Sequence, residues 1–204
     1  MRDEGFKEFS YGDLRFIVFD DVYEPAEDTF LLVDNLHVRD GETVLDVGTG
    51  CGILAVISAF KASRVVAIDI NPSAVRCARI NAEINGVLEK IDFICCSLLD
   101  PLRNNVAFDL ALFNAPYLPI REKPKDWLSY AWAGGRGGNE VARKFIEEAS
   151  RRMKTGGRIM LIQSSLSDIN KTLSEFKRRG LKTRIAAERR FFFEKIALIE
   201  AVKT

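Results

Sequence analysis

The segment Glu42–Ala62 reads ETVLDVGTGCGILAVISAFKA and places a short apolar run, a glycine-rich turn and a longer apolar stretch in direct succession. The run at about 43–47 has the length and composition of a buried strand, and the stretch after the turn is typical of a helix. Gly48, Gly50 and Gly52 stand at alternate positions between them. Because glycine has no side chain, the backbone here can pass close to a ligand. The segment therefore predicts a β-α unit with a ligand-binding turn.

The same order of elements recurs along the chain. A second strand is predicted at RVVAIDI (64–70), and Asn71 and Pro72 predict the start of a helix, since asparagine caps helices and proline fits their first turn. Later strands are predicted at 91–96, 108–113 and 156–164, and later helices at 138–154 and 167–180. This alternation favours a largely parallel sheet.

The C-terminal segment LKTRIAAERRFFFEKIALIEAV (181–202) contains two extended runs with no room for a helix between them. Parallel neighbours need a long crossover, so these two runs predict an antiparallel hairpin. With 204 residues, of which 47% are hydrophobic, the chain has the usual length of one domain. We expect residues 1–204 to form a single domain.

The composition of the chain argues against a membrane protein, a secreted protein and a protein that binds mainly nucleic acid. The chain has no run of about 18 apolar residues, and its N-terminus is too charged for a signal peptide, so we expect a cytoplasmic protein with no membrane partner. The net charge of +1 argues against nucleic acid as the main partner. One stretch, 171–190, carries eight basic residues and two glutamates, for which a solvated helix face is the favoured interpretation.

The four cysteines are Cys51, Cys77, Cys95 and Cys96. They form no C-x-x-C pair and have no histidine at ligand spacing, so neither a zinc site nor a disulfide framework is indicated. We interpret them as buried thiols that act as small apolar groups. No metal site is predicted.

The glycine turn is not the dinucleotide fingerprint, whose third glycine would fall at position 53, where this chain has Ile53. Asp69, at the end of the second strand, can accept hydrogen bonds from ribose hydroxyls. The acidic Asp46 opens the turn and disfavours a phosphate chain. A nucleoside ligand without phosphates, such as S-adenosylmethionine, suits this pattern; the alternative is a tight strand-to-helix turn with no ligand.

A second candidate site is FNAPYLP (113–119), which follows a predicted buried strand. In an open α/β sheet, ligands bind beyond the carboxyl ends of the strands, where Asn114 would lie. The Asn114 side-chain oxygen and the carbonyl of Ala115 can each accept one N–H of a planar NH2 group. Tyr117 offers that group a flat face, and Pro116 stiffens the turn. If the glycine turn binds S-adenosylmethionine, such a site would methylate the NH2 group by orienting it rather than with a strong base.

Three segments carry a resemblance: VYEPAEDTFLL (22–32), the pair DVGTGCG and AIDINP, and AWAGGRGG (131–138). With these the chain resembles the HemK-related class I methyltransferases, in the archaeal and eukaryotic branch that methylates the glutamine of the Gly-Gly-Gln motif in class I translation release factors. The resemblance spans about residues 20–200. It implies a Rossmann-like fold with a mostly parallel seven-stranded sheet, a C-terminal antiparallel hairpin and helices on both faces.

The resemblance also implies that Thr29, with its neighbours Glu27 and Asp28, helps to close the cofactor site. The predicted cofactor-binding residues are Glu27, Thr29, Asp46, Gly48, Gly50, Gly52, Asp69, Ile70, Ser97, Leu98 and Asn114, and the predicted catalytic residues are Asn114, Ala115, Pro116 and Tyr117. The chain departs from the family's Asn-Pro-Pro-Tyr at Ala115, and from its Asp-Leu pair at Ser97-Leu98. Since serine is a weaker acceptor than aspartate, the second departure concerns cofactor affinity.

Two other functions stay open at the level of sequence. An adenine-N6 methyltransferase on DNA or RNA would use the same Asn-x-Pro-Tyr turn on a flipped base, and the basic stretch 171–190 speaks for it. A non-catalytic nucleoside-binding subunit would have kept the fold without the reaction. Ala115 and Ser97 are the only residues that favour the subunit, and Asn114 and Tyr117 count against it.

The resemblance also implies a partner. In the usual strand order of this fold, the strand IDFICC (91–96) lies at the edge of the sheet, where open N–H and C=O groups are a liability. A small zinc-binding activator subunit would pair a strand with that edge. The alternative is a self-sufficient monomer whose edge is shielded by Lys90 and Asp92.

Overall fold

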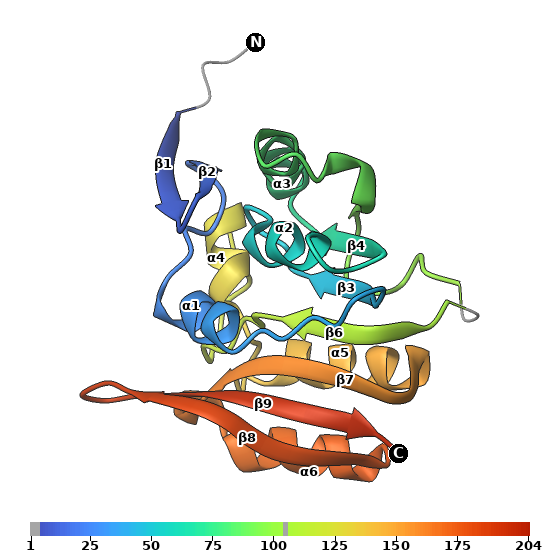
Figure 1. Cartoon of the computed structure of the whole chain (residues 1–204). Helices are drawn as coiled ribbons and strands as arrows, with labels where there is room; N and C mark the ends of the chain where they lie inside the picture. Colours follow the sequence, from blue (N-terminus) through green and yellow to red (C-terminus); the bar gives the residue numbers. More distant parts are fainter. Residues whose placement is uncertain (1–4, 104–105) are drawn as a thin grey trace.

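The computed structural model describes residues 5–103 and 106–204, and its centre is a seven-stranded sheet with the order β5-β4-β3-β6-β7-β9-β8 (Figure 1). The strands are β3 (Thr43–Val47), β4 (Arg64–Asp69), β5 (Ile91–Cys95), β6 (Phe108–Phe113), β7 (Met153–Ser164), β8 (Leu181–Arg190) and β9 (Lys195–Lys203). Strands β3 to β7 are parallel, and β9 runs antiparallel between β7 and β8. The predicted parallel sheet with a C-terminal hairpin is confirmed.

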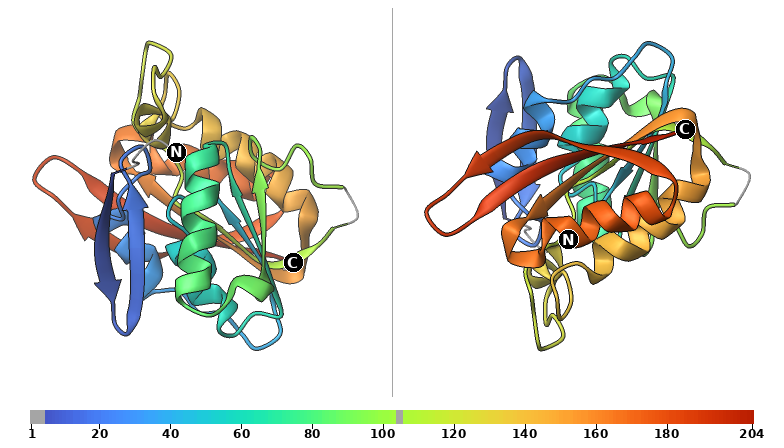
Figure 2. Two further views of the ribbon diagram at one scale, coloured as in Figure 1. Left: turned by 90° about the horizontal axis from the view of Figure 1, so that it is seen from above. Right: turned by 90° about the horizontal axis from the view of Figure 1, so that it is seen from below.

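Helices cover both faces of this sheet, as predicted (Figure 2). They are α1 (Glu27–Asp34), α2 (Ile53–Ala59), α3 (Pro72–Ile84), α4 (Trp127–Trp132), α5 (Glu140–Arg152), α6 (Ile169–Arg178) and two short 3-10 helices, Leu88–Lys90 and Ser165–Ser167. Side chains alternate along a strand, so in β3 Val44 packs toward α1, α2 and α3 and Leu45 toward α5 and α6. Two hydrophobic layers result.

The start of α3 follows the prediction. Asn71 caps the helix, with its side-chain oxygen accepting from the backbone N–H of Ser73 at 2.9 Å, and Pro72 is the first helical residue. Gly86, just beyond the helix, has a φ of 69°, a left-handed conformation that glycine adopts without strain.

An N-terminal hairpin was not predicted. It consists of β1 (Phe6–Tyr11) and β2 (Leu14–Phe19), forms a sheet of its own and packs on α3. Asn81 holds it there: the Asn81 side chain accepts from the N–H of Ile17 and donates to its carbonyl, both at 2.8 Å. A helix side chain here replaces a neighbouring strand, a contact that no local sequence pattern indicates.

Two expectations need correction. All four cysteines are free thiols, but Cys95 is exposed and Cys96 half-buried, so the interpretation of four buried thiols holds only for Cys51 and Cys77. Cys95 ends β5 at the edge of the sheet, where one side has no neighbouring strand in the described part of the chain. The strand predicted at 156–164 begins earlier, at Met153, because the backbone there already pairs with Phe108 of β6.

Candidate functional site

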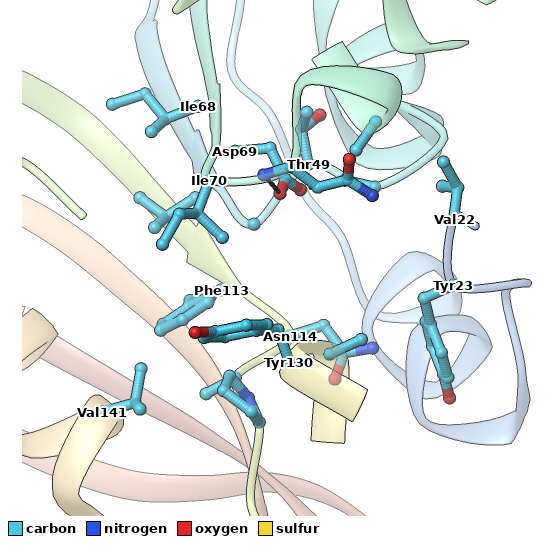
Figure 3. Close-up of a pocket in the computed structure, with 18 of the residues that line it drawn as sticks. Val22, Tyr23, Thr49, Ile68, Asp69, Ile70, Phe113, Asn114, Tyr130 and Val141 are labelled. Carbon is cyan, nitrogen blue, oxygen red and sulfur yellow. Dashed lines mark hydrogen bonds between the residues drawn. The ribbon is translucent and has the colours of Figure 1, made fainter. Parts of the chain in front are cut away.

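A cavity of about 300 Å³ lies beyond the carboxyl ends of β3, β4 and β6 (Figure 3). Asp69 and Thr49 stand on one side of it, and Asn114 and Tyr130 on the other. Of the predicted site residues, its lining includes Thr29, Gly48, Gly50, Asp69, Ile70, Ser97, Leu98, Asn114, Ala115, Pro116 and Tyr117. Both candidate motifs, the glycine turn and Asn-Ala-Pro-Tyr, therefore belong to one pocket.

The glycine turn forms the floor on the β3 side. Gly48 and Gly50 have φ values of 62° and 57°, which residues other than glycine rarely adopt. A Cβ placed on Gly50 would meet no atom of the described residues within 4 Å, whereas one on Gly48 would lie 3.0 Å from the Phe113 ring. Gly50 thus keeps its backbone open toward the pocket, and Gly48 allows the turn to pass over β6.

Asp69 ends β4 and is tied to this turn. Its Oδ2 accepts from the N–H of Gly50 and its Oδ1 from the N–H of Asn71, each at 2.9 Å. Burial raises the pKa of the Asp69 carboxyl, while these backbone N–H groups oppose the rise. Because a carboxylate can accept more than one bond at each oxygen, Asp69 retains acceptor capacity toward the cavity it lines.

The loop after β5 contributes Ser97 and Leu98. Leu98 has a φ of 49°, an uncommon conformation for a residue other than glycine. Such strain persists only where the surroundings enforce it. Cys96, two residues before Leu98, is fixed to β4, since its N–H donates to the Asp69 carbonyl at 2.9 Å. The loop that follows lines the pocket with Ser97 and Leu98.

Asn114 is hydrogen-bonded to helix α1 at the edge of the pocket. Its Nδ2 donates to Thr29 Oγ1 at 3.0 Å. The Thr29 hydroxyl in turn donates to Asp28 Oδ1 at 3.3 Å. The Asn114 Oδ1 atom is buried and accepts no hydrogen bond from the residues that the structure describes. A buried acceptor without a donor is rare and points to a missing partner.

Tyr117 joins the same network through its hydroxyl. It donates to Asp28 Oδ2 at 3.2 Å, and Tyr23 donates to Asp28 Oδ1 at 3.0 Å. Burial raises the pKa of both phenols well above the usual range, and the neighbouring Asp28 charge raises it further. Both tyrosines therefore remain neutral hydrogen-bond donors, and neither can serve as a base near neutral pH.

The segment AWAGGRGG contacts the backbone of Tyr117 and Leu118. The N–H of Leu118 donates to the Trp132 carbonyl at 2.9 Å, and the N–H of Gly134 donates to the Leu118 carbonyl at 3.0 Å. Gly138 has a φ of 71°, and a Cβ there would lie 2.4 Å from the Tyr117 carbonyl oxygen. The glycines of this segment thus permit a close backbone contact that fixes the turn after Asn114.

Three predicted cofactor-binding residues lie outside the cavity lining. Glu27 is exposed and forms an ion pair with Arg189 of β8. Asp46 is fully buried beneath the turn, where its Oδ2 accepts from Thr49 Oγ1 at 2.6 Å. Gly52 packs against α3, since a Cβ there would lie 2.7 Å from that of Ala78. The positions of Asp46 and Gly52 suit shaping the turn rather than contact with a ligand.

Several lining residues were not predicted. They include Tyr23 and three aromatic residues of the segment that forms α4, namely Trp127, Tyr130 and Trp132. Tyr23 and Trp132 lie within the quoted segments VYEPAEDTFLL and AWAGGRGG, so their aromatic rings were the available signal. Among the described residues, no group of three or more histidine, cysteine, aspartate or glutamate side chains is arranged to hold a metal ion, and no helix is long and apolar enough to span a membrane.

The family profile and the similar sequences of known proteins all indicate a methyltransferase. The sequence profile of the methyltransferase small domain matches residues 24–192. The protein named "Putative protein N5-glutamine methyltransferase MJ0928" of Methanocaldococcus jannaschii is 39% identical over 184 residues, which are 89% of this chain and 91% of that protein. Methyltransferase HEMK2 of Homo sapiens is 33% identical over 219 residues and is matched over 100% of both chains.

Solved structures agree. A chain of the E. cuniculi Mtq2–Trm112 complex, described as responsible for methylation of the eRF1 translation termination factor, superposes with a TM-score of 0.72 and 26% identity over 90% of this chain and 99% of that chain. The ribosomal protein L11 methylase of Lactobacillus delbrueckii, with a TM-score of 0.67 and 22% identity over 90% of this chain and 82% of its own, shares the fold. The chain therefore belongs to the methyltransferase small domain family and, within it, to the HemK-related protein glutamine methyltransferases.

Proposed function

We propose that this protein transfers a methyl group from S-adenosylmethionine to the side-chain nitrogen (N5) of the glutamine in the Gly-Gly-Gln motif of a class I translation release factor. The observation that carries the proposal is the buried Oδ1 of Asn114, an acceptor without a partner among the described residues, in a pocket shared with the glycine turn. Relatives named for N5-glutamine and eRF1 methylation support the same acceptor. A role in translation termination would place the protein in the cytoplasm.

The residues on the β3 and β4 side fit S-adenosylmethionine. Gly50 leaves its backbone open to the pocket, and the Asp69 carboxylate keeps acceptor capacity for the two ribose hydroxyls. Ile70 and Leu98 offer apolar contact to the adenine ring, and the Ser97 hydroxyl can accept from its amino group. The bound cofactor supplies an electrophilic methyl group on a sulfonium. Thr29 closes the site from the side of α1.

Asn114 and Ala115 hold the acceptor amide in this proposal. An amide nitrogen is a poor nucleophile because its lone pair is delocalised, so the protein must orient and polarise it. Asn114 Oδ1 accepts one N–H and the Ala115 carbonyl accepts the other, which aims the nitrogen at the methyl carbon. As the N–C bond forms, the S–C bond of the sulfonium would break and leave a neutral thioether, and the amide nitrogen would release one proton to solvent.

Tyr117 positions the substrate from its face. Its ring is held by the hydrogen bond to Asp28 and by the contacts of the AWAGGRGG segment. Pro116 limits the backbone freedom of the same turn. The glutamine amide lies flat on the Tyr117 ring, and the site needs no base of its own.

Mass spectrometry tests the proposal directly. The enzyme is incubated with S-adenosylmethionine and a class I release factor, and fragmentation of the product locates any added methyl group. We expect one methyl group on the glutamine of Gly-Gly-Gln and none on a factor in which that glutamine is changed to glutamate. Transfer to a different residue, or to none even when the activator subunit proposed below is supplied, would refute the assigned acceptor.

The adenine-N6 alternative loses most of its support. It shares the Asn-x-Pro-Tyr turn with the glutamine hypothesis, and its distinguishing support was the basic stretch 171–190, where five of the eight basic side chains pair with carboxylates of the same chain. The ion pairs are Lys171–Asp168, Arg178–Glu175, Arg179–Glu147, Arg184–Glu200 and Arg189–Glu27. Nucleic-acid binding depends on cations available to phosphates, so this surface does not favour it.

We further propose a small zinc-binding activator subunit on strand β5. In the described part of the chain β5 pairs only with β4, and its outer edge is open. The Mtq2 structure that this chain resembles is a complex with Trm112. A partner strand can add to such an edge through main-chain hydrogen bonds. Phe93→Asp, in the middle of β5, should weaken the association in co-purification, whereas an isolated chain that is soluble and fully active would refute the partner.

A further inference from the structure

The tip of the β8–β9 hairpin is strongly apolar and exposed. Phe191, Phe192 and Phe193, here called the hairpin tip, are 41%, 92% and 87% exposed. The rings of Phe192 and Phe193 pack edge to face, with centroids 4.6 Å apart, and so form one apolar knob. Adjacent phenylalanines in water are unfavourable, and such patches mark interaction sites.

The topology brings this tip to the same end of the sheet as the pocket. β9 is antiparallel to both β7 and β8, so β8 runs in the direction of β7 and ends where the parallel strands end. Ser164, the last residue of β7, pairs with Ile196, so residues 191–194 extend beyond it. In Figures 1 and 2 the hairpin projects from the body of the molecule on this side.

The hairpin is held in place beside the pocket. Ser164 Oγ donates to Glu194 Oε1 at 2.6 Å, and the N–H of Lys195 donates to Ser165 Oγ at 3.0 Å. Arg189 pairs with Glu27, one residue before Asp28 of the site. The tip is therefore presented in a fixed position and not as a loose loop.

A second aromatic surface rims the cavity. Trp127, Tyr130 and Trp132, here called the aromatic rim, line the cavity and are 37%, 43% and 45% exposed. Tyr23 connects the two surfaces: its ring meets Trp132 edge-on at 6.5 Å between centroids. Burial, Asp28 and Tyr117 raise the pKa of the Tyr23 hydroxyl, and the Glu194 carboxylate of the hairpin adds a smaller rise.

We propose that the hairpin tip is a docking surface for the protein substrate, which it grips outside the pocket while the aromatic rim surrounds the entering loop; this inference rests on the proposed function. Aromatic side chains dominate the energetics of protein interfaces. A lipid surface is disfavoured, because membrane-binding loops need cations free for anionic lipids. At this hairpin Arg189 and Lys195 are already paired with Glu27 and Glu188, and Arg190, next to the tip, is a single exposed cation where lipid-binding segments carry a cluster of them.

The test compares a large and a small substrate. The double variant Phe192→Ser/Phe193→Ser is assayed on the whole release factor and on a short Gly-Gly-Gln peptide, and the affinity for the factor is measured by biolayer interferometry. We expect at least a tenfold rise in both KM and Kd for the factor, an unchanged kcat, and unchanged kinetics on the peptide. Equal KM and Kd values in variant and wild type would overturn the proposal.

Phe60→Ser is the matched control. Phe60 is 51% exposed at the end of α2, which runs back from the glycine turn to the opposite end of the sheet. This change should leave KM and Kd for the factor unaltered. Loss of binding to phosphatidylcholine–phosphatidylserine vesicles in the double variant, or a change from dimer to monomer in sedimentation, would assign the tip to a membrane or to a second copy and overturn the proposal.

The two proposals fail separately. A wild-type chain that binds the factor through the tip but, with the proposed activator subunit supplied, methylates neither factor nor peptide would retain the docking surface and refute the proposed function. A chain that methylates the factor, with a KM indifferent to the double variant, would retain the function and refute the docking surface. A wild-type chain that does not bind the factor at all would refute the docking surface.

Discussion

Thr29 Oγ1 and Asn114 Nδ2 lie 3.0 Å apart although 85 residues separate them in the chain, and this bond decides which end of the Asn114 amide meets the pocket. A hydroxyl has one proton to donate, and that of Thr29 goes to Asp28 Oδ1. Thr29 must therefore accept from Asn114, which leaves Asn114 Oδ1 as the acceptor for an incoming N–H. The order Asp28, Thr29, Asn114 thus fixes an orientation that Asn114 alone would not have.

Thr29→Val removes this control while it preserves the shape of the side chain. We expect kcat to fall about tenfold or more, equivalent to about 1.4 kcal/mol of barrier, because the amide can then turn its NH2 toward the substrate. Thr29→Ser retains the hydroxyl and should restore most of kcat. Steady-state kinetics of both variants provide the measurement. Equal losses in the two would indicate a packing role for Thr29 instead.

Asn114→Ala tests the acceptor itself. Removal of one preorganised polar group that acts in the transition state typically lowers kcat by about 10²–10³-fold. We expect a loss of that size with little change in S-adenosylmethionine affinity, since Asp69 lies on the other side of the pocket. Single-turnover rates and calorimetry separate the two effects. Retention of most of the turnover would contradict the role given to Asn114.

The fold was predictable because its signals are local. The strands β3, β4 and β6 are buried on both faces and appear in the sequence as short apolar runs, and the capping pair Asn71–Pro72 marks the start of α3. The N-terminal hairpin was missed, because its attachment depends on Asn81, whose side chain meets Ile17 from 64 residues away. A tertiary contact of this kind has no periodic signature.

The site was predictable in outline and not in its connections. The glycine turn and the Asn-Ala-Pro-Tyr turn each end a buried strand, so the topology alone brings them together. The sequence pattern could not distinguish glycines that face a ligand from those that permit packing. Gly50 opens to the cavity, whereas Gly52 allows α2 to approach Ala78 of α3. The two glycines have the same spacing in the sequence, and only their surroundings in the folded structure distinguish them.

Asp69→Asn should weaken cofactor binding. The variant keeps one oxygen for the N–H of Gly50 or Asn71 but places an NH2 group where the carboxylate accepts. We expect at least a tenfold rise in the Kd for S-adenosylmethionine, measured by calorimetry, because two ribose hydroxyls would lose a charged acceptor. Thermal unfolding without cofactor checks that the fold is intact. An unchanged Kd would remove Asp69 from the cofactor site.

Asp46 should make stability depend on pH. It is fully buried, and its Oδ1 accepts no hydrogen bond from the residues that the structure describes. Burial raises the pKa of this carboxyl from 3.8 to about 7, the Asp69 charge adds to the rise, and the hydrogen bond from Thr49 opposes it. Between these two values the folded chain holds a proton that the unfolded chain has released. The stabilisation is therefore complete below the unfolded pKa and is lost as the pH rises through about 7.

Asp46→Asn replaces the titrating group with a neutral one of the same shape. The free energy of unfolding of the variant, relative to the wild type, should therefore increase between about pH 5 and about pH 8, since only the wild type loses stabilisation as Asp46 ionises. Urea unfolding of both proteins at the two pH values measures this difference, and other groups that titrate in both chains cancel from it. A difference that stays constant across the range would mean that Asp46 does not change its charge there.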